Sequence, residues 1–294
     1  MLSRRRMLAG LIGLGHLSLV GCANRAVQAP VEGPAPGAEL QGPAFPPGLS
    51  SARAIDAVID ISHSVKVSDF GLAREHSNIL AVLHKATEGG DWQDPAYAER
   101  RAKARNAGLL WGAYHFGTRQ YPGADQARNF LATAQPGPDT LLALDLELNE
   151  RIPANSMTIQ QAEEFVATVE AITGRLPLVY THQSWADGRR TGPGGRSLGA
   201  PISPQSILAQ CDLWLADYRS QPQLPKAWAD KGWRIWQYAG ENGRTPWPPD
   251  SPVRSVSGVE RCDRNLFLGD RGTLASYWRS GNSHPMLVSS LAPG

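Results

Sequence analysis

Residues 141–147 read Leu141-Leu-Ala-Leu-Asp145-Leu-Glu147, an apolar run that ends in two carboxylic acids. A run this apolar is typical of a strand buried on both faces of a parallel sheet. Asp145 and Glu147 are two residues apart, so on a strand both side chains point to the same face. They come at the carboxyl end of the strand, where α/β barrels place catalytic groups. The pattern predicts a pair of catalytic acids, although two exposed acids in a loop would give the same sequence.

Two carboxyl groups held this close cannot both ionise easily, so one of them should have a raised pKa and act as a general acid. Other acids also follow predicted strands: Asp60 ends Ala-Val-Ile-Asp, and Asp263 lies in Arg-Cys-Asp-Arg-Asn. We expect these acids to form one cluster, with a Mg²⁺ or Ca²⁺ site as the competing interpretation. The histidines are scattered without metal-ligand spacing, so we expect no metal and no cofactor.

The apolar strand pattern recurs along the chain between helical segments. The predicted strands are Ala57–Ile61, Ile79–Lys85, Leu110–Phe116, Leu141–Leu146, Leu176–Thr181, Leu213–Ala216 and Arg234–Tyr238. One predicted helix opens at Asp94-Pro95, and another has a capping box of Thr158 with Gln161 and ends at Gly174. This alternation predicts parallel βα units, and so an α/β fold that is either a barrel or an open doubly wound sheet. No Gly-x-Gly-x-x-Gly or Walker-type loop follows a strand, which argues against nucleotide binding.

The composition is that of a globular domain. Of the 294 residues, 41% are hydrophobic, which is enough for a core. Lys and Arg number 29 against 27 Asp and Glu. Residues 1–21 hold three of the arginines and no acid, so the rest has 26 basic against 27 acidic groups and a net charge of −1. This balance argues against nucleic acid as a partner, and three cysteines are too few for a disulfide-built miniprotein.

The first residues are typical of an export signal. Ser3-Arg4-Arg5 before a short apolar stretch is similar to a twin-arginine signal, and the stretch is too short to span a membrane. Leu19-Val20-Gly21-Cys22 is similar to a bacterial lipobox, in which Cys22 becomes the lipidated first residue. An ordinary signal peptide with an incidental cysteine is the alternative. A lipid on Cys22 anchors a protein at a membrane without spanning it. Ala23 after the cysteine favours the outer membrane, by similarity to enterobacterial sorting rules.

The sequence divides into four predicted parts. Residues 1–21 are the signal, and residues 22–52 are a Pro- and Gly-rich tether that cannot bury enough apolar surface to fold. Residues 53–278 form one catalytic domain, and residues 279–294 are a flexible tail without periodicity. We expect a monomer in the periplasm of the cell envelope, held at the outer membrane by its lipid anchor.

Aromatic residues gather at the ends of the same predicted strands. Those best placed to line a cleft are Tyr114, Tyr180, Tyr218 and Trp236, together with His115 among the histidines. Aromatic faces with polar tips suit sugar rings. The sequence has no Gly-x-Ser-x-Gly elbow, which argues against a serine hydrolase.

These residues belong to a series of short motifs that resembles glycoside hydrolase family 25, the Chalaropsis-type lysozymes. The motifs run in family order across nearly all of residues 55–268. They are Val58-Ile-Asp60-Ile-Ser-His63, Leu83-His-Lys85-Ala-Thr-Glu88-Gly89, Gly112-Ala-Tyr114-His115-Phe116, Leu144-Asp145-Leu-Glu147, Leu178-Val-Tyr180-Thr181, Asp212-Leu-Trp214-Leu-Ala-Asp-Tyr218, Trp233-Arg-Ile-Trp236-Gln237-Tyr238 and Asp263-Arg-Asn265.

The resemblance implies a modified TIM-like β/α barrel with fewer helices than strands. It also implies hydrolysis of the β-1,4 bond from N-acetylmuramic acid to N-acetylglucosamine in peptidoglycan. Glu147 matches the family's proton donor, and Asp60, Asp145 and Asp263 match the other acids of its cleft. Asp145 would orient or stabilise the reacting sugar, and whether it attacks directly or the substrate's acetamido group does stays open. The residues implied to line the cleft are Tyr114, His115, Tyr180, Trp214, Tyr218 and Gln237.

Two stretches depart from the simplest family pattern. Residues 188–206 look like a flexible loop beside the cleft, and residues 240–260 insert a Pro-rich stretch. Whether Cys211 and Cys262 form a disulfide or remain two free thiols stays open. The expected partners are peptidoglycan strands and, through the anchor, a membrane. The alternatives to an enzyme of this family are a non-catalytic peptidoglycan-binding lipoprotein and, with less support, a metal-dependent hydrolase.

Overall fold

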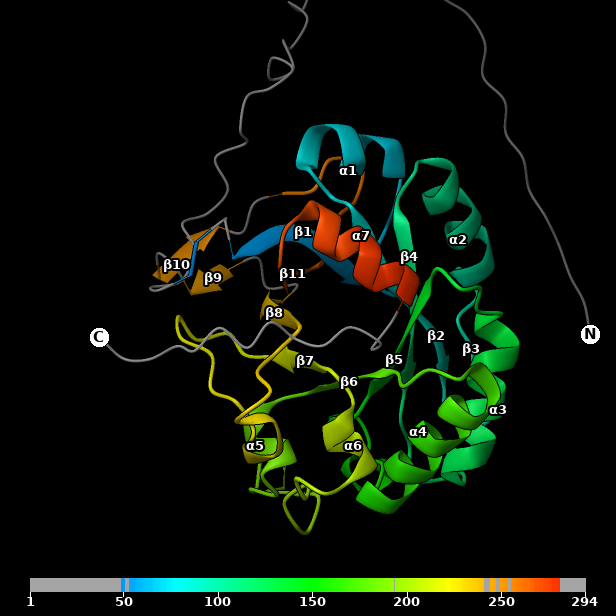
Figure 1. Cartoon of the computed structure of the whole chain (residues 1–294), viewed down its shortest axis with the longest axis vertical. Helices are drawn as coiled ribbons and strands as arrows, with labels where there is room; N and C mark the ends of the chain where they lie inside the picture. The colour runs from blue at the N-terminus through cyan, green and yellow to red at the C-terminus, as the bar shows by residue number, and fades with distance from the viewer. Residues whose placement is uncertain are drawn as a thin grey trace, which may run out of the picture.

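Eight strands close into a barrel (Figure 1). Around the barrel their order is β1-β2-β4-β5-β6-β7-β8-β11, and β11 pairs back to β1. From β1 to β8 neighbouring strands run parallel. The strands are β1 Ala54–Ile61, β2 Ala81–Glu88, β4 Leu110–Phe116, β5 Thr140–Asp145, β6 Leu178–Thr181, β7 Leu213–Ala216, β8 Ile235–Ala239 and β11 Asp263–Leu268. The closed sheet confirms the predicted α/β barrel and excludes the alternative of an open doubly wound sheet.

The structure is a computed structural model. It describes residues 49–50, 53–192, 194–240, 244–246, 249–252 and 255–280. The predicted signal, Cys22, nearly all of the tether and residues 281–294 of the predicted tail lie outside the described residues. No helix among the described residues is long and apolar enough to cross a membrane.

The last strand, β11, was not predicted, because its first residues Asp263-Arg-Asn are polar rather than apolar. It runs antiparallel to both of its neighbours, β8 and β1. The connection from β8 includes the hairpin β9 Arg244–Pro246 and β10 Pro249–Pro252. An antiparallel strand needs no crossover helix, so the chain can leave β8 and return at the same end of the barrel.

Seven helices in the described part of the chain surround the barrel, fewer than its strands, as predicted. Only a 3₁₀ turn, Lys226–Trp228, joins β7 to β8. The helices are α1 Phe70–Ser77, α2 Tyr97–Asn106, α3 Gly123–Ala134, α4 Ile159–Thr173, the short α5 Gln183–Ala186 and α6 Ile207–Gln210, and α7 Arg271–Ser280. One further strand, β3 Trp92–Gln93, pairs with β2 outside the barrel.

The predicted helix ends are correct for α4 and displaced for α2. Thr158 and Gln161 form the capping box of α4, and Gly174 ends it with a φ of 71°. Helix α2 starts at Tyr97 with Ala96 as its cap, later than Asp94-Pro95. Asp94 still stabilises this turn, because its carboxylate accepts a hydrogen bond of 2.9 Å from the Ala96 N–H.

Alternate residues of each strand face the inside of the barrel and the surrounding helices. On β5, Leu141 and Ala143 belong to the inner apolar cluster, whereas Leu142 and Leu144 belong to the outer one. All six residues of β5 are buried, as expected of a strand covered on both faces. Inside the barrel, Gly112 lies so close to Leu83 that any Cβ atom there would clash.

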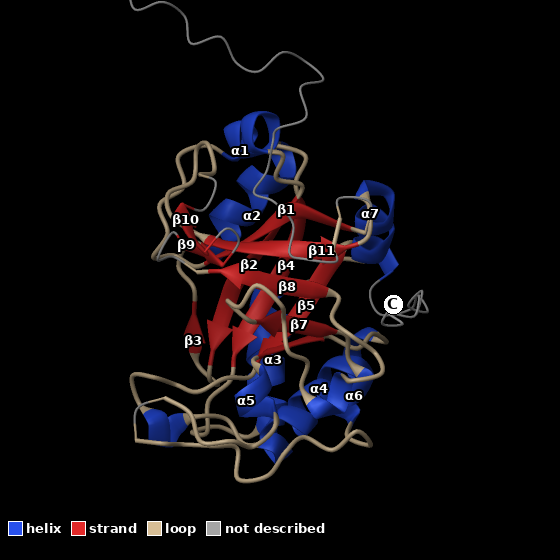
Figure 2. Cartoon of the chain, turned by 90° about the vertical axis from the view of Figure 1, so that its left-hand side faces the viewer, coloured by secondary structure: helices blue, strands red, loops and turns tan. Residues whose placement is uncertain are grey.

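Helix α7 closes one end of the barrel, opposite the end where the β9–β10 hairpin lies (Figure 2). Because β11 runs in reverse, the chain leaves it at the amino ends of the parallel strands, and α7 covers that end. The Tyr277 hydroxyl donates to Asp212 just before β7, over 2.9 Å. The indole N–H of Trp278 donates to the carbonyl of Trp111, also over 2.9 Å. The helix continues to Ser280, past the predicted domain end at residue 278.

Both described cysteines are buried free thiols. Cys211 precedes the parallel strand β7 and so lies at the amino end of the barrel strands. Cys262 precedes the antiparallel strand β11 and so lies at the opposite end. The open question of their pairing is therefore answered by topology, since a disulfide needs Cα atoms within about 7 Å.

A buried ion pair joins the two strands that close the barrel. Arg264 of β11, 1% exposed, donates over 2.6 Å to the carboxylate of Asp56 on β1. The Tyr238 hydroxyl of β8 donates to the same carboxylate over 3.0 Å. Together these contacts connect three neighbouring strands on the outer face of the sheet.

We predict that Asp56→Ala lowers the free energy of unfolding by about 3–5 kcal/mol, because it leaves the buried Arg264 guanidinium without its carboxylate. Tyr238→Phe keeps the ion pair and removes the hydroxyl that donates to Asp56, so it should cost about 1 kcal/mol. Urea unfolding of both variants measures the difference. Equal losses in the two variants would contradict the assigned role of the ion pair.

Candidate active site

Four acids lie at the carboxyl end of the parallel strands. Asp60 is near the end of β1, Asp145 is the last residue of β5, and Glu147 follows two residues later. Asp263 starts β11, and because β11 is antiparallel its first residue lies at this same end, directly opposite Asp60. We call these four residues the acid cluster. The expectation that they come together is met for all four: burial raises the pKa of both Tyr114 and Tyr218, and the charge of each of the four acids raises it further.

Gln237 of β8 connects the two opposed acids. Its side-chain N–H group donates to Asp60 over 3.1 and 3.2 Å and to Asp263 over 3.3 Å. Its side-chain oxygen accepts from the hydroxyls of Tyr180, at 2.9 Å, and Tyr218, at 2.8 Å. Two donors on the oxygen turn the amide nitrogen toward the acids, so Gln237 offsets the repulsion between carboxylates that face each other across a strand pair.

A second amide holds Asp60 from the other side. The Asn265 side-chain N–H group donates to Asp60 over 2.7 Å, and its oxygen accepts from the indole N–H of Trp214 over 2.7 Å. Trp214 is 1% exposed and lies against the rings of Tyr114 and Tyr180. Trp214 is therefore buried behind the site, where it orients Asn265, and it does not line the surface that a sugar could contact. Asp60 is surrounded by fixed donors, which suits an ionised carboxylate.

Asp145 has a different environment. It is buried, and its Oδ1 atom has no hydrogen-bond partner within the described part of the chain. Burial raises its pKa well above the ordinary value, the neighbouring Glu147 carboxyl raises it further, and the Lys85 ammonium opposes both. Glu147 is partly buried, and burial, followed by the charge of Glu150, raises its pKa to about 7. The pair therefore keeps one proton near neutral pH, as two interacting acids do.

Lys85 of β2 is the cation that faces this pair. Its ammonium forms an ion pair of 2.6 Å with Glu88. The same nitrogen lies 4.7 Å from the centre of the Phe116 ring and 5.2 Å from that of Trp92. Because Lys85 lowers the pKa of both Asp145 and Glu147, it is also part of the electrostatics of the site and not only a structural residue.

Of the residues predicted to line a cleft, His115 is elsewhere, and the prediction is wrong for it. Strand alternation points its side chain out of the barrel, where it stacks on Phe165 of α4 with ring centres 4.8 Å apart. It bonds Thr87 over 2.8 Å and Gln126 over 3.1 Å, and burial lowers its pKa to about 3. It is therefore a neutral residue of the barrel–helix interface. Trp236, on the same outward alternation, donates to the Asp217 carbonyl over 2.6 Å.

Tyr114, Tyr180, Tyr218 and Gln237 lie around the acid cluster; Tyr218 is the most exposed of them and Tyr114 is partly exposed. Tyr218 is 52% exposed, Tyr180 is 8% exposed and Gln237 is 2% exposed. Asn265 was quoted in a motif but was not predicted as a site residue. It is two residues after Asp263, so it points to the same side of β11, and a correct prediction of that strand would have identified it.

Among the described residues, no group of three or more His, Cys, Asp or Glu side chains is arranged to hold a metal ion. Asp60 and Asp263 instead accept hydrogen bonds from the side-chain amides of Gln237 and Asn265, which compete with a cation for the same oxygens.

Comparison with known proteins gives one consistent result. The model of the family "Glycosyl hydrolases family 25" matches residues 59–246, which include Asp60, Asp145 and Glu147. Lysozyme M1 of Streptomyces globisporus is 29% identical over 230 residues, which are 74% of this chain and 69% of that protein. The structure of the bacterial lysozyme from Streptomyces coelicolor is similar, with a TM-score of 0.62 and 25% identity, over 79% of this chain and 99% of the other. The muramidase from Acremonium alcalophilum is similar with a TM-score of 0.58 and 29% identity, over 75% and 97%.

We predict that Glu147→Gln stabilises the chain at alkaline pH. The pKa of Glu147 rises from 4.5 to about 7 on folding, so the folded state binds this proton more tightly than the unfolded state. Its stabilisation is complete below about pH 4.5 and is lost as the pH rises through about 7. A glutamine at position 147 does not titrate, so the variant does not lose stability in this way as the pH rises. The free energy of unfolding of the variant, relative to the unmodified chain, should therefore rise by about 1–3 kcal/mol between pH 4.5 and pH 8.

Denaturant unfolding across this pH range measures the effect. Glu99→Gln on α2 is the matched control, because the Lys103 ammonium lowers the pKa of that exposed carboxyl and its pH trend has the opposite sign. A difference between Glu147→Gln and the unmodified chain that does not change with pH would contradict the raised pKa.

Proposed function

Because the chain belongs to the glycosyl hydrolases family 25, we propose that its acid cluster hydrolyses the β-1,4 bond from N-acetylmuramic acid to N-acetylglucosamine. The family and the similar lysozymes make the chain a glycoside hydrolase of the lysozyme type that acts on peptidoglycan. The particular bond and the role of each residue are our proposal.

The raised pKa of Glu147 beside Asp145 is the observation on which the proposal rests. A general acid must hold its proton at the working pH and release it to the leaving oxygen during the reaction. With a pKa of about 7, Glu147 meets this requirement near neutrality. Asp60 and Asp263, which amide donors hold at the same end of the barrel, contribute negative charge where the sugar becomes positive, since the transition state resembles an oxocarbenium ion.

In this mechanism Glu147 donates its proton to the glycosidic oxygen as the bond to the sugar breaks. The proton that leaves the Asp145–Glu147 pair makes the pair more negative at the moment when positive charge develops on the ring. Asp145 then stabilises the reacting sugar. Water finally bonds to the anomeric carbon that has lost its leaving oxygen and returns a proton to the Asp145–Glu147 pair, whether an intermediate first forms with Asp145 or with the substrate's acetamido group. Asp60 and Asp263 stay in place through Gln237 and Asn265, and the hydroxyls of Tyr180 and Tyr218 are committed to Gln237.

We predict that the unmodified protein releases muropeptides with muramic acid at the reducing end, as identified by mass spectrometry of digested peptidoglycan. Glu147→Gln should lower kcat by about 10²–10⁴-fold, the usual contribution of a general acid. Activity should fall above about pH 7, where Glu147 loses its proton. Glu150→Gln is the matched control: it removes a charge that raises the pKa of Glu147, so it should stay active with this alkaline limit moved to lower pH.

Other outcomes would contradict the proposal in different ways. Reducing ends of N-acetylglucosamine would show that the other glycosidic bond is cleaved. No release at all, with equal binding of peptidoglycan by the unmodified protein and by Glu147→Gln, would favour the non-catalytic peptidoglycan-binding lipoprotein.

We also infer from the sequence that residues 1–21 direct export and that Cys22 carries a lipid, so that residues 22–52 tether the catalytic domain 53–278 to a membrane. The support is the lipobox-like Leu19-Val20-Gly21-Cys22 and the Pro-rich stretch after it. Action on peptidoglycan places the protein in the cell envelope, and the lipid would hold it on the periplasmic face of the outer membrane.

We predict that Cys22→Ser moves the protein from the membrane fraction to the soluble fraction of the periplasm. Cys211→Ser is the control, because Cys211 is a buried thiol of the barrel and its replacement should leave the protein with the membranes. Equal membrane association of the unmodified protein and Cys22→Ser would contradict the lipid anchor.

A further inference from the structure

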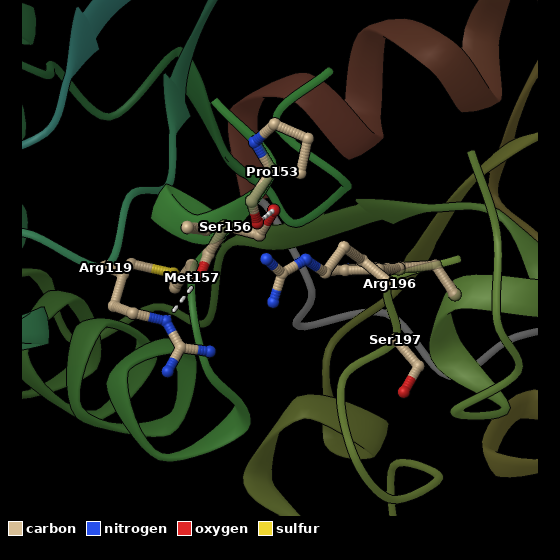
Figure 3. A pocket seen from close by; sticks show the side chains of 8 residues that line it. Arg119, Pro153, Ser156, Met157, Arg196 and Ser197 are labelled. Carbon is tan, nitrogen blue, oxygen red and sulfur yellow. Dashed lines mark hydrogen bonds between the residues drawn. The ribbon is translucent and has the colours of Figure 1, made fainter. Parts of the chain in front are cut away.

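A hollow lies on loops that follow β4, β5 and β6 (Figure 3). Its volume is about 270 Å³, room for a small polar group. Its lining consists of Arg119, Pro153, Ala154, Ser156, Met157, Trp185, Arg196 and Ser197. These loops continue from the carboxyl ends of parallel strands, so the hollow belongs to the same face of the barrel as the acids. We call it the arginine pocket.

The arginine pocket is rich in donors and has no acidic side chain in its lining. Arg119 donates over 3.3 Å to the Ser156 carbonyl, the dashed line in Figure 3, and the Arg196 guanidinium points from its loop toward Ser156. Neither guanidinium has an ion pair with a carboxylate of the described residues. The indole Nε1 of Trp185, a residue only 1% exposed, has no hydrogen-bond partner in the described part of the chain.

These groups match one class of ligand. Guanidinium groups bind carboxylates through paired, charge-assisted hydrogen bonds, and a buried indole N–H without an acceptor adds a further donor. Both arginines are exposed, so their guanidinium groups are open to a ligand from solvent, and a neutral sugar would form no ion pair with them. Arg196 also lies in residues 188–206, the loop that departs from the simplest family pattern, so the pocket depends on a feature of this chain.

The pocket is within reach of a substituent on a sugar held at the acid cluster. The Ser156 hydroxyl accepts a hydrogen bond of 2.9 Å from the Asn149 N–H, and Asn149 is two residues beyond Glu147. Chain geometry then places the Cα atoms of Ser156 and Glu147 within about 14 Å of each other. An extended peptide of three to five residues spans roughly 10–17 Å. The peptide stem carried by N-acetylmuramic acid has this length and bears free carboxylates.

We propose that the arginine pocket binds a free carboxylate of the peptide stem of peptidoglycan. The proposal rests on the proposed function, because that function brings N-acetylmuramic acid to the acid cluster. It makes the enzyme selective for glycan strands that still carry their peptides. Arg119 and Arg196 contribute to substrate binding and take no part in the breaking of the bond.

The test compares three soluble substrates prepared from the same glycan strands. One carries peptide stems with free carboxylates, one carries stems whose carboxylates have been converted to amides, and one has had its stems removed by an amidase. The double variant Arg119→Gln/Arg196→Gln should raise KM about tenfold on the first substrate, the loss expected from two charge-assisted contacts, and leave kcat unchanged. On the other two substrates its KM should equal that of the unmodified protein. Arg190→Gln, in the same loop but outside the lining, should change none of these values.

An equal change of KM on all three substrates, or no change on any, would overturn the proposal for the pocket while the proposed function stands. Failure of the unmodified protein to release reducing ends from any substrate would instead overturn the proposed function. In that case, calorimetric binding of the three substrates still tests the pocket. If the unmodified protein binds the substrate with free carboxylates most tightly and the double variant loses this preference, the pocket proposal is supported. Equal binding of the three substrates by the unmodified protein contradicts it.

Discussion

The opposition of Asp60 and Asp263 across the β1–β11 pair is the constraint on which the site depends. Two carboxylates facing each other on neighbouring strands repel, and a chain tolerates them only when donors are supplied. Gln237 and Asn265 supply them, and these amides are in turn oriented by the hydroxyls of Tyr180 and Tyr218 and by the indole of Trp214. One antiparallel strand therefore brings both a fourth acid, Asp263, and the Asn265 amide that supports Asp60 to the end of the barrel where the parallel strands place their acids.

The donors are distributed unevenly over the acid cluster, and this difference separates the roles of its members. Asp60 receives hydrogen bonds from two amides, whereas a buried oxygen of Asp145 has no partner in the described chain. A proton is therefore retained where donors are scarce, on the Asp145–Glu147 pair, and negative charge is retained where they are abundant. Lys85 limits how far the pKa values of the pair rise, so that the proton remains available near neutral pH. The fold thus produces one acid and several carboxylates from residues of the same chemistry.

Most of the barrel could be predicted from sequence because its parallel strands are buried on both faces and read as apolar runs, of which Leu141–Leu146 is the clearest. The strand β11 could not, because its leading residues serve the site and are polar. For the same reason Asn265 was missed as a site residue while Asp263 was found as an acid. The prediction for His115 was wrong for another reason. Neighbouring residues on a strand face opposite sides of the sheet, and because Tyr114 faces inward, His115 faces outward. Strand-end positions located the acids, and the resemblance suggested their roles and the residues around them. Only three-dimensional packing distinguishes Trp214, which is buried behind the site, from Tyr218, which is exposed at it.

The central claim is that the Asp145–Glu147 pair keeps one proton at neutral pH. A carbon-13 NMR titration of the side-chain carboxyl carbons, with Glu147→Gln used to assign them, measures this directly. The account predicts that one carboxyl of the pair keeps the chemical shift of a protonated acid until the pH approaches about 7. Titration of both carboxyls near the ordinary value of about 4 would contradict it.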